Sequence, residues 1–545
     1  MTIFSIRGFQ TPMVSRIGDM ALLASVILAG TVFPRLMLLG RFPVSDEGYY
    51  AHVAQQIHHS LVNGQGIPDY GGLSLYPMLC SWVFSLQYNP LISLRLIDLG
   101  VAVVMAFLLY RVLARTCNSN TGAALIAFVF TFTMNQLVFI DSGFKNSITA
   151  AFVPLLLALV IGIGAIRDKK PGSAWWMAGA LTALAVVLRE TFVPFALLGL
   201  VSVFIAQGKK AALQFFIGGV AAGILLIGGI LIARGGAAET IAAYRAAGIM
   251  VGSVPSDRLL EYFIFYGLAT IRFSSIALAF GAAAIVILSA VIFLRRDKSL
   301  LLATVFWLSF IGAALVESAT KICYAYHFAI ALPGLAGLCA LALREIIRLW
   351  RAMEWAHGRI NNMLAVTGIV LSAVWLYFSC SRLSMEHWPV TLETLIAAPG
   401  GEWPEKFTSR SKYLFMAAEI RKIIPENGTL SISRGMHALY LLTGRSPPVY
   451  RLSDLSATAF LLDFSVPDIR QALLDCAPDI LVVTTMDEPL PEAVLAAEIY
   501  ETAAKIPFGK LNHGYFDGVM IFRKTKETVC LEKQGMAEWL TRISR

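Results

Sequence analysis

The sequence predicts a polytopic α-helical membrane protein with about eleven transmembrane helices and a C-terminal α/β domain outside the membrane. Three observations predict this fold class: 57% of the 545 residues are hydrophobic, only 14% are charged, and the apolar residues gather in long runs. A soluble domain carries about 25% charged residues, so this chain has too little charge to cover a water-exposed surface of its size. The same composition excludes a disordered chain, a disulfide-rich secreted module and a coiled coil.

The apolar runs have the length of spanning helices, which is about 20 residues. They cover residues 21–39, 94–110, 123–140, 148–166, 175–188, 192–206, 212–232, 273–294, 300–316, 323–343 and 363–380. Only residues 189–191 separate the fifth run from the sixth, so these short runs are either two spans or one re-entrant element. The glycine pairs Gly218-Gly219 and Gly228-Gly229 lie inside the seventh run and predict close packing against another helix.

The distribution of charge predicts the topology. One set of alternate connections holds sixteen Lys and Arg residues against five acids, and the opposite set holds seven against nine, giving net charges of +11 and −2. Cytoplasmic connections carry the excess of positive charge. The N-terminus is therefore expected in the cytoplasm, and an odd number of spans puts everything after residue 380 on the outer side. The formal charge of +9 reflects this topology, and no nucleic-acid partner is expected.

The connection between the first two runs, residues 40–92, is far longer than the usual few residues. It predicts an amphipathic helix with two faces. The apolar face carries Tyr50, Val53, Ala54, Ile57 and Leu61, and the polar face carries His52, Gln55, Gln56 and His59. A second interfacial helix is predicted over residues 73–86. Such helices lie in the plane of the membrane interface, where they would frame a lateral site for a lipid head group. His52, His58 and His59 form no metal-ligand pattern and are assigned to a polar face.

The C-terminal segment is water-soluble in character. Helical patterning near residues 412–424 precedes predicted strands at 429–433, 479–484 and 519–522, which together indicate a small α/β domain. We therefore expect a transmembrane catalytic domain over residues 1–380 and a soluble domain over 381–545. Cys476 and Cys530 would pair in an oxidising exterior, but an unpaired buried thiol is the expected state of each.

Acidic residues at the outer membrane surface are the candidate catalytic groups: Asp46, Glu47 and Asp141. Asp46 and Glu47 follow the first run, where a membrane-embedded cavity would open, and Asp141 follows the third run, with Lys145 one turn later. If the third span packs against the first, Asp46 and Asp141 share a cavity, as a general base and a group that orients an acceptor hydroxyl or holds a divalent cation. The structural alternatives are a helix-start acidic pair and an i, i+4 pair with Lys145.

Basic and aromatic residues near the membrane are candidate phosphate ligands. Arg189 lies between the two short runs, where ionisable residues are costly, and a guanidinium matches phosphate geometry. An internal ion pair with Glu190 explains Arg189 equally well. Lys321, Tyr324 and His327 cluster at the outer start of the tenth run and would bind a lipid phosphate. A snorkelling lysine beside an aromatic belt is the ordinary explanation for Lys321 and Tyr324.

Taken together, the chain resembles the GT-C superfamily of polyprenyl-phosphate-dependent glycosyltransferases, especially the family of protein O-mannosyltransferases and lipid A aminoarabinose transferases. The resemblance rests on the long first loop that opens with Asp46-Glu47, its two interfacial helices with Tyr76-Pro77, the acid after the third span and the tyrosine-rich residues 321–333. Residues 439–448, LYLLTGRSPP, are also similar to the Y-x-L-T-G-R-x-P stretch in the outer domain of many bacterial members. Order and topology carry more of the resemblance than any single motif.

The resemblance implies an inverting transfer of a sugar from a polyprenyl-phosphate carrier to an envelope acceptor, which is lipid A, a polysaccharide, a lipid or a protein. It places the reaction at the periplasmic face of a bacterial inner membrane. On the family pattern Asp46 would be the general base and Asp141 the second polar group of the cavity, while Arg189 or Lys321 would hold the leaving phosphate. The candidate substrate-binding set is completed by Lys145, Tyr324, His327 and Tyr76. The resemblance implies no fixed cofactor, because members of the superfamily differ in whether they need a divalent cation such as Mg²⁺ or Mn²⁺.

Two other classes of membrane protein share this composition. A lipid-linked glycan flippase or transporter would show internal repeats with Gly- or Pro-broken spans at matching positions, and the sequence has no such pairing. An envelope glycan polymerase or ligase would share the carrier lipid but place its long loop late in the chain. The chain departs from the GT-C pattern in having one proline, Pro77, where many members have two, which leaves the shape of the lipid-facing wall open.

Overall fold

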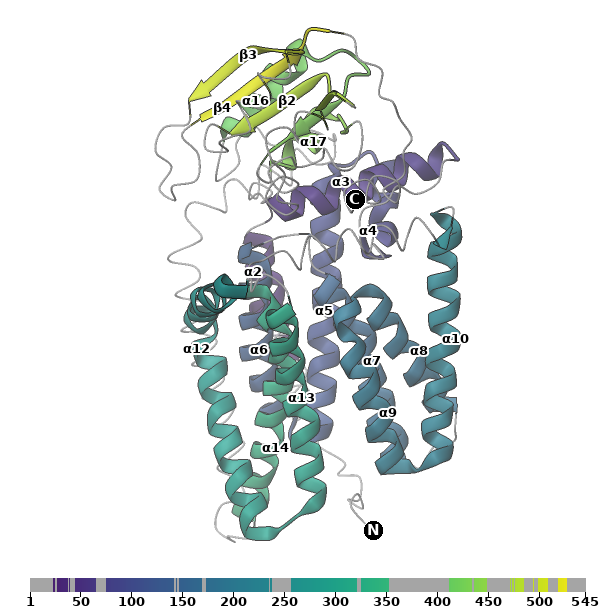
Figure 1. Ribbon diagram of the computed structural model, residues 1–545. Coiled ribbons are helices and arrows are strands. Elements are labelled where there is room, and N and C mark those ends of the chain that lie inside the picture. The colour runs from purple at the N-terminus through teal and green to yellow at the C-terminus, as the bar shows by residue number, and fades with distance from the viewer. Residues whose placement is uncertain are drawn as a thin grey trace.

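The protein is a bundle of long helices that carries a small sheet domain at one end (Figure 1). This computed structural model describes residues 23–24, 27–37, 39, 45–64, 75–141, 144, 147–168, 173–234, 236–237, 256–320, 325–351, 411–433, 436–447, 471, 473–474, 476–484, 494, 498–507 and 518–526. Within these residues, seven helices are long and apolar enough to cross a membrane, and Ser173–Leu188 is a shorter apolar helix. The chain is therefore a multi-pass membrane protein.

The helices of the bundle follow the predicted apolar runs. Their bounds are η1 (Leu28–Val32), α2 (Phe33–Met37), α5 (Pro90–Cys117), α6 (Asn120–Asp141), α7 (Ser147–Asp168), α8 (Ser173–Leu188), η4 (Glu190–Phe192), α9 (Val193–Gln207), α10 (Lys209–Ala233), α12 (Ser256–Arg295), α13 (Lys298–Thr320), η5 (Ala325–Ile330) and α14 (Ala331–Arg351). The two short runs form separate helices, α8 and α9, joined by the single turn of η4. The predicted run over residues 363–380 lies outside the described residues.

Local sequence explains where α5 begins and ends. Asn89 caps its first turn, because the side-chain oxygen accepts hydrogen bonds from the backbone N–H groups of Leu91 and Ile92 at 3.1 and 3.2 Å. Pro90 occupies the first helical position, where its missing N–H costs nothing. At the other end Asn118 adopts the left-handed conformation, with φ of 55°, and stops the helix.

Small residues set the packing of α8 against α10. A side chain on Gly218 would clash with the backbone carbonyl of Trp176, and one on Gly179 would clash with the carbonyl of Phe215. The predicted close packing is therefore confirmed at Gly218, where the two backbones meet. It is wrong for Gly228 and Gly229, since no described atom lies within 4 Å of a Cβ built at either position. Glycine in a spanning helix permits close approach but does not require it.

Two interfacial helices lie across the end of the bundle that faces the sheet domain (Figure 1). They are α3 (Ser45–Val62) and α4 (Leu75–Cys80), which continues as the 3₁₀ helix η2 (Ser81–Ser85). Both were predicted from the sequence and are confirmed. On α3 the predicted apolar face holds for Val53 and Ile57, which are buried, but not for Leu61, which is 52% exposed at the end of the helix.

The C-terminal domain has the predicted α/β character. It contains α16 (Ser411–Ile423), β1 (Leu430–Ile432), α17 (Ala438–Thr443), β2 (Ile480–Thr484), β3 (Tyr500–Pro507) and β4 (Gly518–Lys524). The strands form one sheet in the order β1-β2-β4-β3, with β1 parallel to β2 and β4 antiparallel to both of its neighbours. The predicted helix and three strands are confirmed, and β3 was missed. The proposed domain boundary at residue 380 lies outside the described residues.

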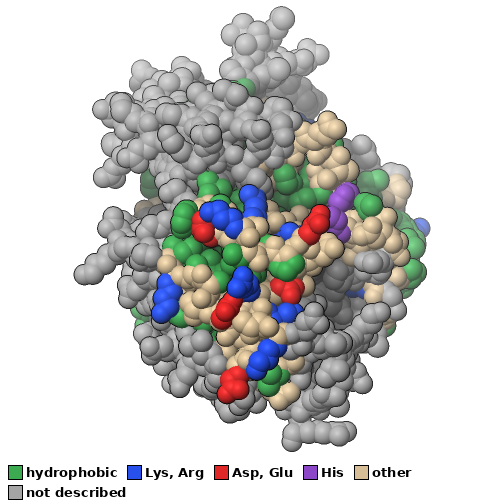
Figure 2. Space-filling view, turned by 90° about the horizontal axis from the view of Figure 1, so that it is seen from above, with side chains coloured by type: hydrophobic (Ala, Val, Ile, Leu, Met, Phe, Trp, Pro, Cys, Tyr) green, Lys and Arg blue, Asp and Glu red, His purple; other side chains and the backbone are tan. Residues whose placement is uncertain are grey.

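Charged side chains mark the surface of this domain as water-exposed. Figure 2 views the molecule from above, where Lys and Arg side chains lie beside Asp and Glu side chains. Ion pairs of the domain are Lys422 with Glu419, at 2.6 Å between Nζ and Oε1, and Arg523 with Glu501, at 2.9 Å between Nε and Oε1. This surface differs from the helices below it, where large apolar side chains are exposed along α9 and α10.

A disulfide corrects one sequence expectation. Cys476, which was expected to be an unpaired thiol, is disulfide-bonded, whereas Cys80, Cys117 and Cys339 are free. The scattered cysteines of the sequence carry no spacing that would have revealed this bond.

Candidate functional site

A buried ion pair stands at the start of α3. Glu47 is fully buried, and both of its carboxylate oxygens are bound by Arg95 of α5, at 2.7 Å from Nε to Oε1 and 2.6 Å from Nη2 to Oε2. The planar guanidinium makes this two-point contact with the geometry that a carboxylate prefers. Arg95 also donates to the backbone carbonyl of Leu39. The first turn of α3 is thereby fastened to the N-terminal end of α5.

The same carboxylate holds the chain segment that follows α6. The backbone N–H of Phe144 donates to Oε1 of Glu47 at 2.8 Å. Phe144 comes three residues after Asp141, the last residue of α6. Since both oxygens of Glu47 are engaged, the geometry favours a positioning role for this residue. Its neighbour Asp46 lies in the same first turn of α3. The side chains of Asp46 and Asp141 are not among those that the structure describes.

The third predicted span packs against the first, as a shared site for Asp46 and Asp141 requires. We expected Asp46 and Asp141 to approach one another only if the third span packs against the first. The amide of Asn135 on α6 donates to the carbonyl of Gly30 in η1 at 2.8 Å, so these two helices are in direct contact. Together with the bond to Phe144, this contact brings the end of α6 to the beginning of α3. The distance between the two carboxylates stays a prediction.

The junction at Glu47 is the meeting point of α3, α5 and the segment after α6, formed by Glu47, Arg95 and Phe144. A buried polar network lies beneath it. The hydroxyl of Tyr76 in α4 donates to Oδ1 of Asp98 in α5 at 3.0 Å, and the other oxygen of Asp98 pairs with Arg35 of α2. Arg35 also donates to Oδ1 of Asn135 at 2.7 Å. All four side chains are buried. A buried charge is tolerated when it is paired and hydrogen-bonded, as both are here. Tyr76 thus connects α4 to α2, α5 and α6.

The remaining predicted residues are placed as follows. Arg189 and Glu190 are half-buried at the turn between α8 and α9. The preceding residue, Leu188, packs against the apolar cluster that contains Tyr76 and Phe144, so this turn approaches the same end of the bundle. His327 is buried in η5. Lys145, Lys321 and Tyr324 lie outside the described residues.

The residues that the sequence reasoning missed are Arg35, Arg95, Asp98 and Asn135. Each lies within or beside an apolar run. The signal for Arg35, Arg95 and Asp98 is an ionisable residue inside an apolar run, and the signal for Asn135 is a polar residue there. Among the described residues, no three His, Cys, Asp or Glu side chains come together in a way that would hold a metal ion.

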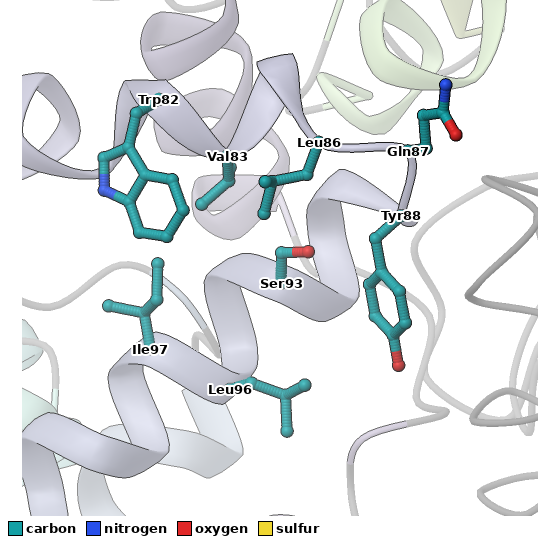
Figure 3. Close-up of a pocket in the computed structure, with 8 residues that line it drawn as sticks. All are labelled: Trp82, Val83, Leu86, Gln87, Tyr88, Ser93, Leu96 and Ile97. Carbon is teal, nitrogen blue, oxygen red and sulfur yellow. The ribbon is translucent and has the colours of Figure 1, made fainter.

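An open apolar pocket lies beside the junction, where η2 meets the first turns of α5 (Figure 3). Its volume is about 480 Å³. The lining residues are Trp82, Val83, Leu86, Gln87, Tyr88, Ser93, Leu96 and Ile97. Ile97 also packs against the cluster that contains Tyr76 and Phe144, which connects the pocket to the junction. An apolar wall with a few polar groups suits an aliphatic chain whose head group remains polar.

The C-terminal domain covers α3. His52 was predicted on a polar, exposed face, but it is 1% exposed and its ring stacks on Tyr440 of α17, with ring centres 4.5 Å apart. The prediction is wrong because a helical pattern does not reveal which face a second domain covers. Tyr440 belongs to the LYLLTGRSPP stretch that carried part of the family resemblance, so this stretch forms the contact with α3.

The burial of His52 predicts that stability falls in mild acid. Desolvation is the main reason that the pKa of His52 is lowered to about 3; the nearby His437 and, less strongly, His59 also lower it, and a hydrogen bond with Gln55 opposes them. The unfolded state, with a pKa near 6.5, therefore binds the extra proton as the pH falls below 6.5, and stability is lost. We expect this group to remove about 2 kcal/mol between pH 7 and pH 5.

Thermal unfolding of the full chain in detergent at these two pH values measures the effect. The variant His52→Phe keeps an aromatic ring on Tyr440 and cannot take up a proton, so its pH dependence should be flatter by that amount. An identical slope for the variant and the natural chain would rule out His52 as the titrating group.

The sequence matches no known family profile, and no curated protein is similar to it at a significant level. Solved structures are similar. ArnT from Cupriavidus metallidurans in the apo state has 11% identity and a TM-score of 0.53, over 93% of this chain and 97% of that one. AglB from Archaeoglobus fulgidus, in complex with an inhibitory peptide and a dolichol-phosphate, has 14% identity and a TM-score of 0.54, over 93% and 74%.

The arabinofuranosyltransferase AftD from Mycobacteria has 14% identity and a TM-score of 0.51, over 96% of this chain and 41% of that one. At such identities the similarity is one of fold. The fold that the resemblance implied is confirmed, since these solved structures are GT-C glycosyltransferases. The chain therefore has the GT-C fold, with a bundle of membrane helices, a long first loop of interfacial helices and a C-terminal α/β domain.

Proposed function

We propose that this protein is a glycosyltransferase that moves a sugar from a polyprenyl-phosphate carrier to an acceptor in the cell envelope. The observation that carries the proposal is the junction at Glu47, which ties the start of α3, and with it Asp46, to the end of α6. The fold supports a lipid-linked donor, because structures with the same fold hold undecaprenyl phosphate, in ArnT, and dolichol-phosphate, in AglB.

The chemistry assigns one task to each part of the site. Asp46 takes the proton of an acceptor hydroxyl, whose oxygen attacks the anomeric carbon of the donor sugar. The new bond forms on the face opposite the phosphate, so the bond to the phosphate oxygen breaks, the configuration inverts, and the phosphate leaves with the electron pair. A cation near the leaving group stabilises its charge, which is the role proposed for Arg189 or Lys321. Asp141 orients the acceptor.

The apolar pocket beside the junction supports a lipid substrate. Its walls come from η2, the first turns of α5 and the residues between them (Figure 3), at the end of the bundle where α3 lies (Figure 1). Removing an isoprenoid or acyl chain from water against these walls contributes about 25 cal/mol per Å² of apolar surface. The buried hydroxyl of Tyr76 is already bound to Asp98, so we assign this residue to holding α4 in place beneath the substrate.

Mg²⁺ or Mn²⁺ remains an alternative for holding the phosphate. Glu47 does not fit as a metal ligand, because Arg95 and the Phe144 N–H occupy its oxygens. Asp46 and Asp141 are the carboxylates that would hold such an ion, whose charge would then stabilise the phosphate in place of a side chain.

We place the reaction on the outer face of a bacterial inner membrane, with the N-terminus in the cytoplasm. The charge distribution of the connections supports this orientation. The disulfide at Cys476 supports it independently, since disulfides persist in the oxidising periplasm and are rare in the cytosol. The acceptor is then an envelope molecule: lipid A, a polysaccharide, a lipid or a protein.

Mass spectrometry of envelope glycans and of polyprenyl-phosphate sugars tests the proposal, comparing cells that contain the protein with cells that lack it. The expected result is an acceptor that loses one sugar mass in the deletion strain while the loaded carrier accumulates. The missing mass then identifies the sugar class. If the envelope glycans keep every sugar mass in the deletion strain, the proposed transfer is wrong. Purified protein that moves the intact loaded carrier across a vesicle, without transfer, would establish a flippase instead.

A further inference from the structure

Helix α17 of the C-terminal domain is seated on the first half of α3. A Cβ on Gly48 would lie 2.6 Å from the backbone nitrogen of Ala438 and 3.0 Å from the carbonyl carbon of His437. The two backbones therefore touch, and no larger residue fits without displacing one of them. Gly48 is two residues from Asp46, in the same helix.

Side chains extend this contact along α3. The ring of His52 stacks on Tyr440 with an interplanar angle of 21°, and Tyr49 meets His437 edge to face, with ring centres 5.1 Å apart. Further along, the amide of Gln56 donates to the hydroxyl of Ser446. Three successive turns of α3 are thus in contact with one segment of the C-terminal domain.

The other side of α17 is anchored in its own domain. Tyr440 is fully buried in a cluster with Met416 and Ile420 of α16, and the guanidinium of Arg421 donates to the carbonyl of Leu442. Leu441, in contrast, packs into the cluster that contains Tyr76 and Phe144. The short helix therefore transmits the position of the whole C-terminal domain to the junction at Glu47.

We propose that α17 is a positioning element for the transfer reaction: through His437–Tyr440 the C-terminal domain fixes the orientation of the first turn of α3 and with it the Asp46 carboxylate. This inference rests on the proposed function. A helix is stiff over two turns, so a displacement at Gly48 moves Asp46 by a similar amount. A misplacement of about 1 Å costs roughly 100-fold in rate when the reacting groups must be aligned.

The test compares Gly48→Ala with the matched control Gly100→Ala in the purified full chain, reconstituted in lipid nanodiscs. Gly100 is also a helical glycine, but no described atom lies within 4 Å of its Cβ position. We expect Gly48→Ala to lower kcat by about 10- to 100-fold with little change in the KM for the carrier-linked sugar, and to speed hydrogen exchange over residues 45–52. Gly100→Ala should resemble the natural chain in both measurements.

A second pair of variants separates positioning from folding. His52→Phe preserves the stacked ring and should keep most of kcat, whereas His52→Lys places a charge against Tyr440 and should lower it as Gly48→Ala does. Faster exchange in α3 with an unchanged kcat would overturn the inference, because the contact would then be structural only. Unchanged kcat and exchange in Gly48→Ala would overturn it as well. If the natural chain transfers no sugar, the proposed function fails and this inference fails with it.

Discussion

Replacing Asp46 by asparagine should lower the rate of sugar transfer by a factor of 10² to 10⁴, the contribution of a general base. The change removes the proton acceptor and leaves the shape of the first turn of α3 nearly unchanged. The ion pair of Glu47 with Arg95, one residue along the chain, does not depend on the Asp46 carboxylate. Binding of the carrier lipid should therefore persist while turnover is lost. Single-turnover transfer in detergent, measured beside carrier binding, separates the two effects.

The matched control is Asp297→Asn, the same chemical change at the opposite end of the helices. The Oδ1 atom of Asp297 accepts hydrogen bonds from Ser299 and Leu300 at the start of α13, and asparagine caps a helix equally well. This variant should transfer sugar at the natural rate. Full activity in Asp46→Asn would rule out Asp46 as the general base and favour Asp141 in that role.

Arg95→Ala should destabilise the protein by about 3–5 kcal/mol, the cost of leaving a buried carboxylate unpaired. Glu47 has no access to water, so its charge would keep only the backbone N–H of Phe144. The junction between α3, α5 and the segment after α6 would loosen, and activity would be lost together with stability. Heating followed by size-exclusion chromatography measures the fraction that stays folded.

The double variant Glu47→Gln with Arg95→Met tests whether the unpaired charge of Glu47 causes the loss of stability. The amide oxygen of glutamine still accepts from the Phe144 N–H, while both charges are gone. A buried ion pair replaced as a whole often costs little, so the double variant should recover more than half of the lost stability. A double variant as unstable as Arg95→Ala would show that the side chain of Arg95 is needed for packing and not for pairing. The transfer activity of a stable double variant would report how closely the Asp46 carboxylate must be held.

The sequence predicted the architecture because spanning helices depend on local properties. Length and apolar character sufficed to find the helices from α5 to α14, and the residue pattern of the long first loop sufficed to find both interfacial helices. Long-range contacts were the part that could not be predicted. The burial of His52 depends on α17, and the bond between Gln56 and Ser446 joins positions 390 residues apart. A helical pattern assigns His52 to a polar face and has no access to the domain that covers it.

In the candidate site, too, local features were predicted from the sequence and long-range contacts were not. The sequence placed Asp46 and Glu47 at a helix start and made both catalytic candidates, and the family resemblance singled out Asp46 as the general base. The partners of Glu47, Arg95 and Phe144, are 48 and 97 residues away, so only the structure shows that the Glu47 carboxylate is engaged. Arg35, Arg95 and Asp98 carried a signal that was available, namely charge within or beside an apolar run. Strand β3 was missed since its sequence, YETAAKIP, has too few apolar residues in alternation.

The long-range contacts of α3 form at different times during synthesis of the chain. A ribosome adds about 5–20 residues per second, so the chain reaches Phe144 roughly 5–20 s after Glu47 has been made. The contact with Ser446 becomes available later still, about 20–80 s after Gln56. Until then α3 has the partners of Glu47 but lacks its contact with the C-terminal domain. The nascent chain therefore passes through a stage, tens of seconds long, in which the candidate catalytic helix is tied to α5 and to Phe144 while its other face is still uncovered.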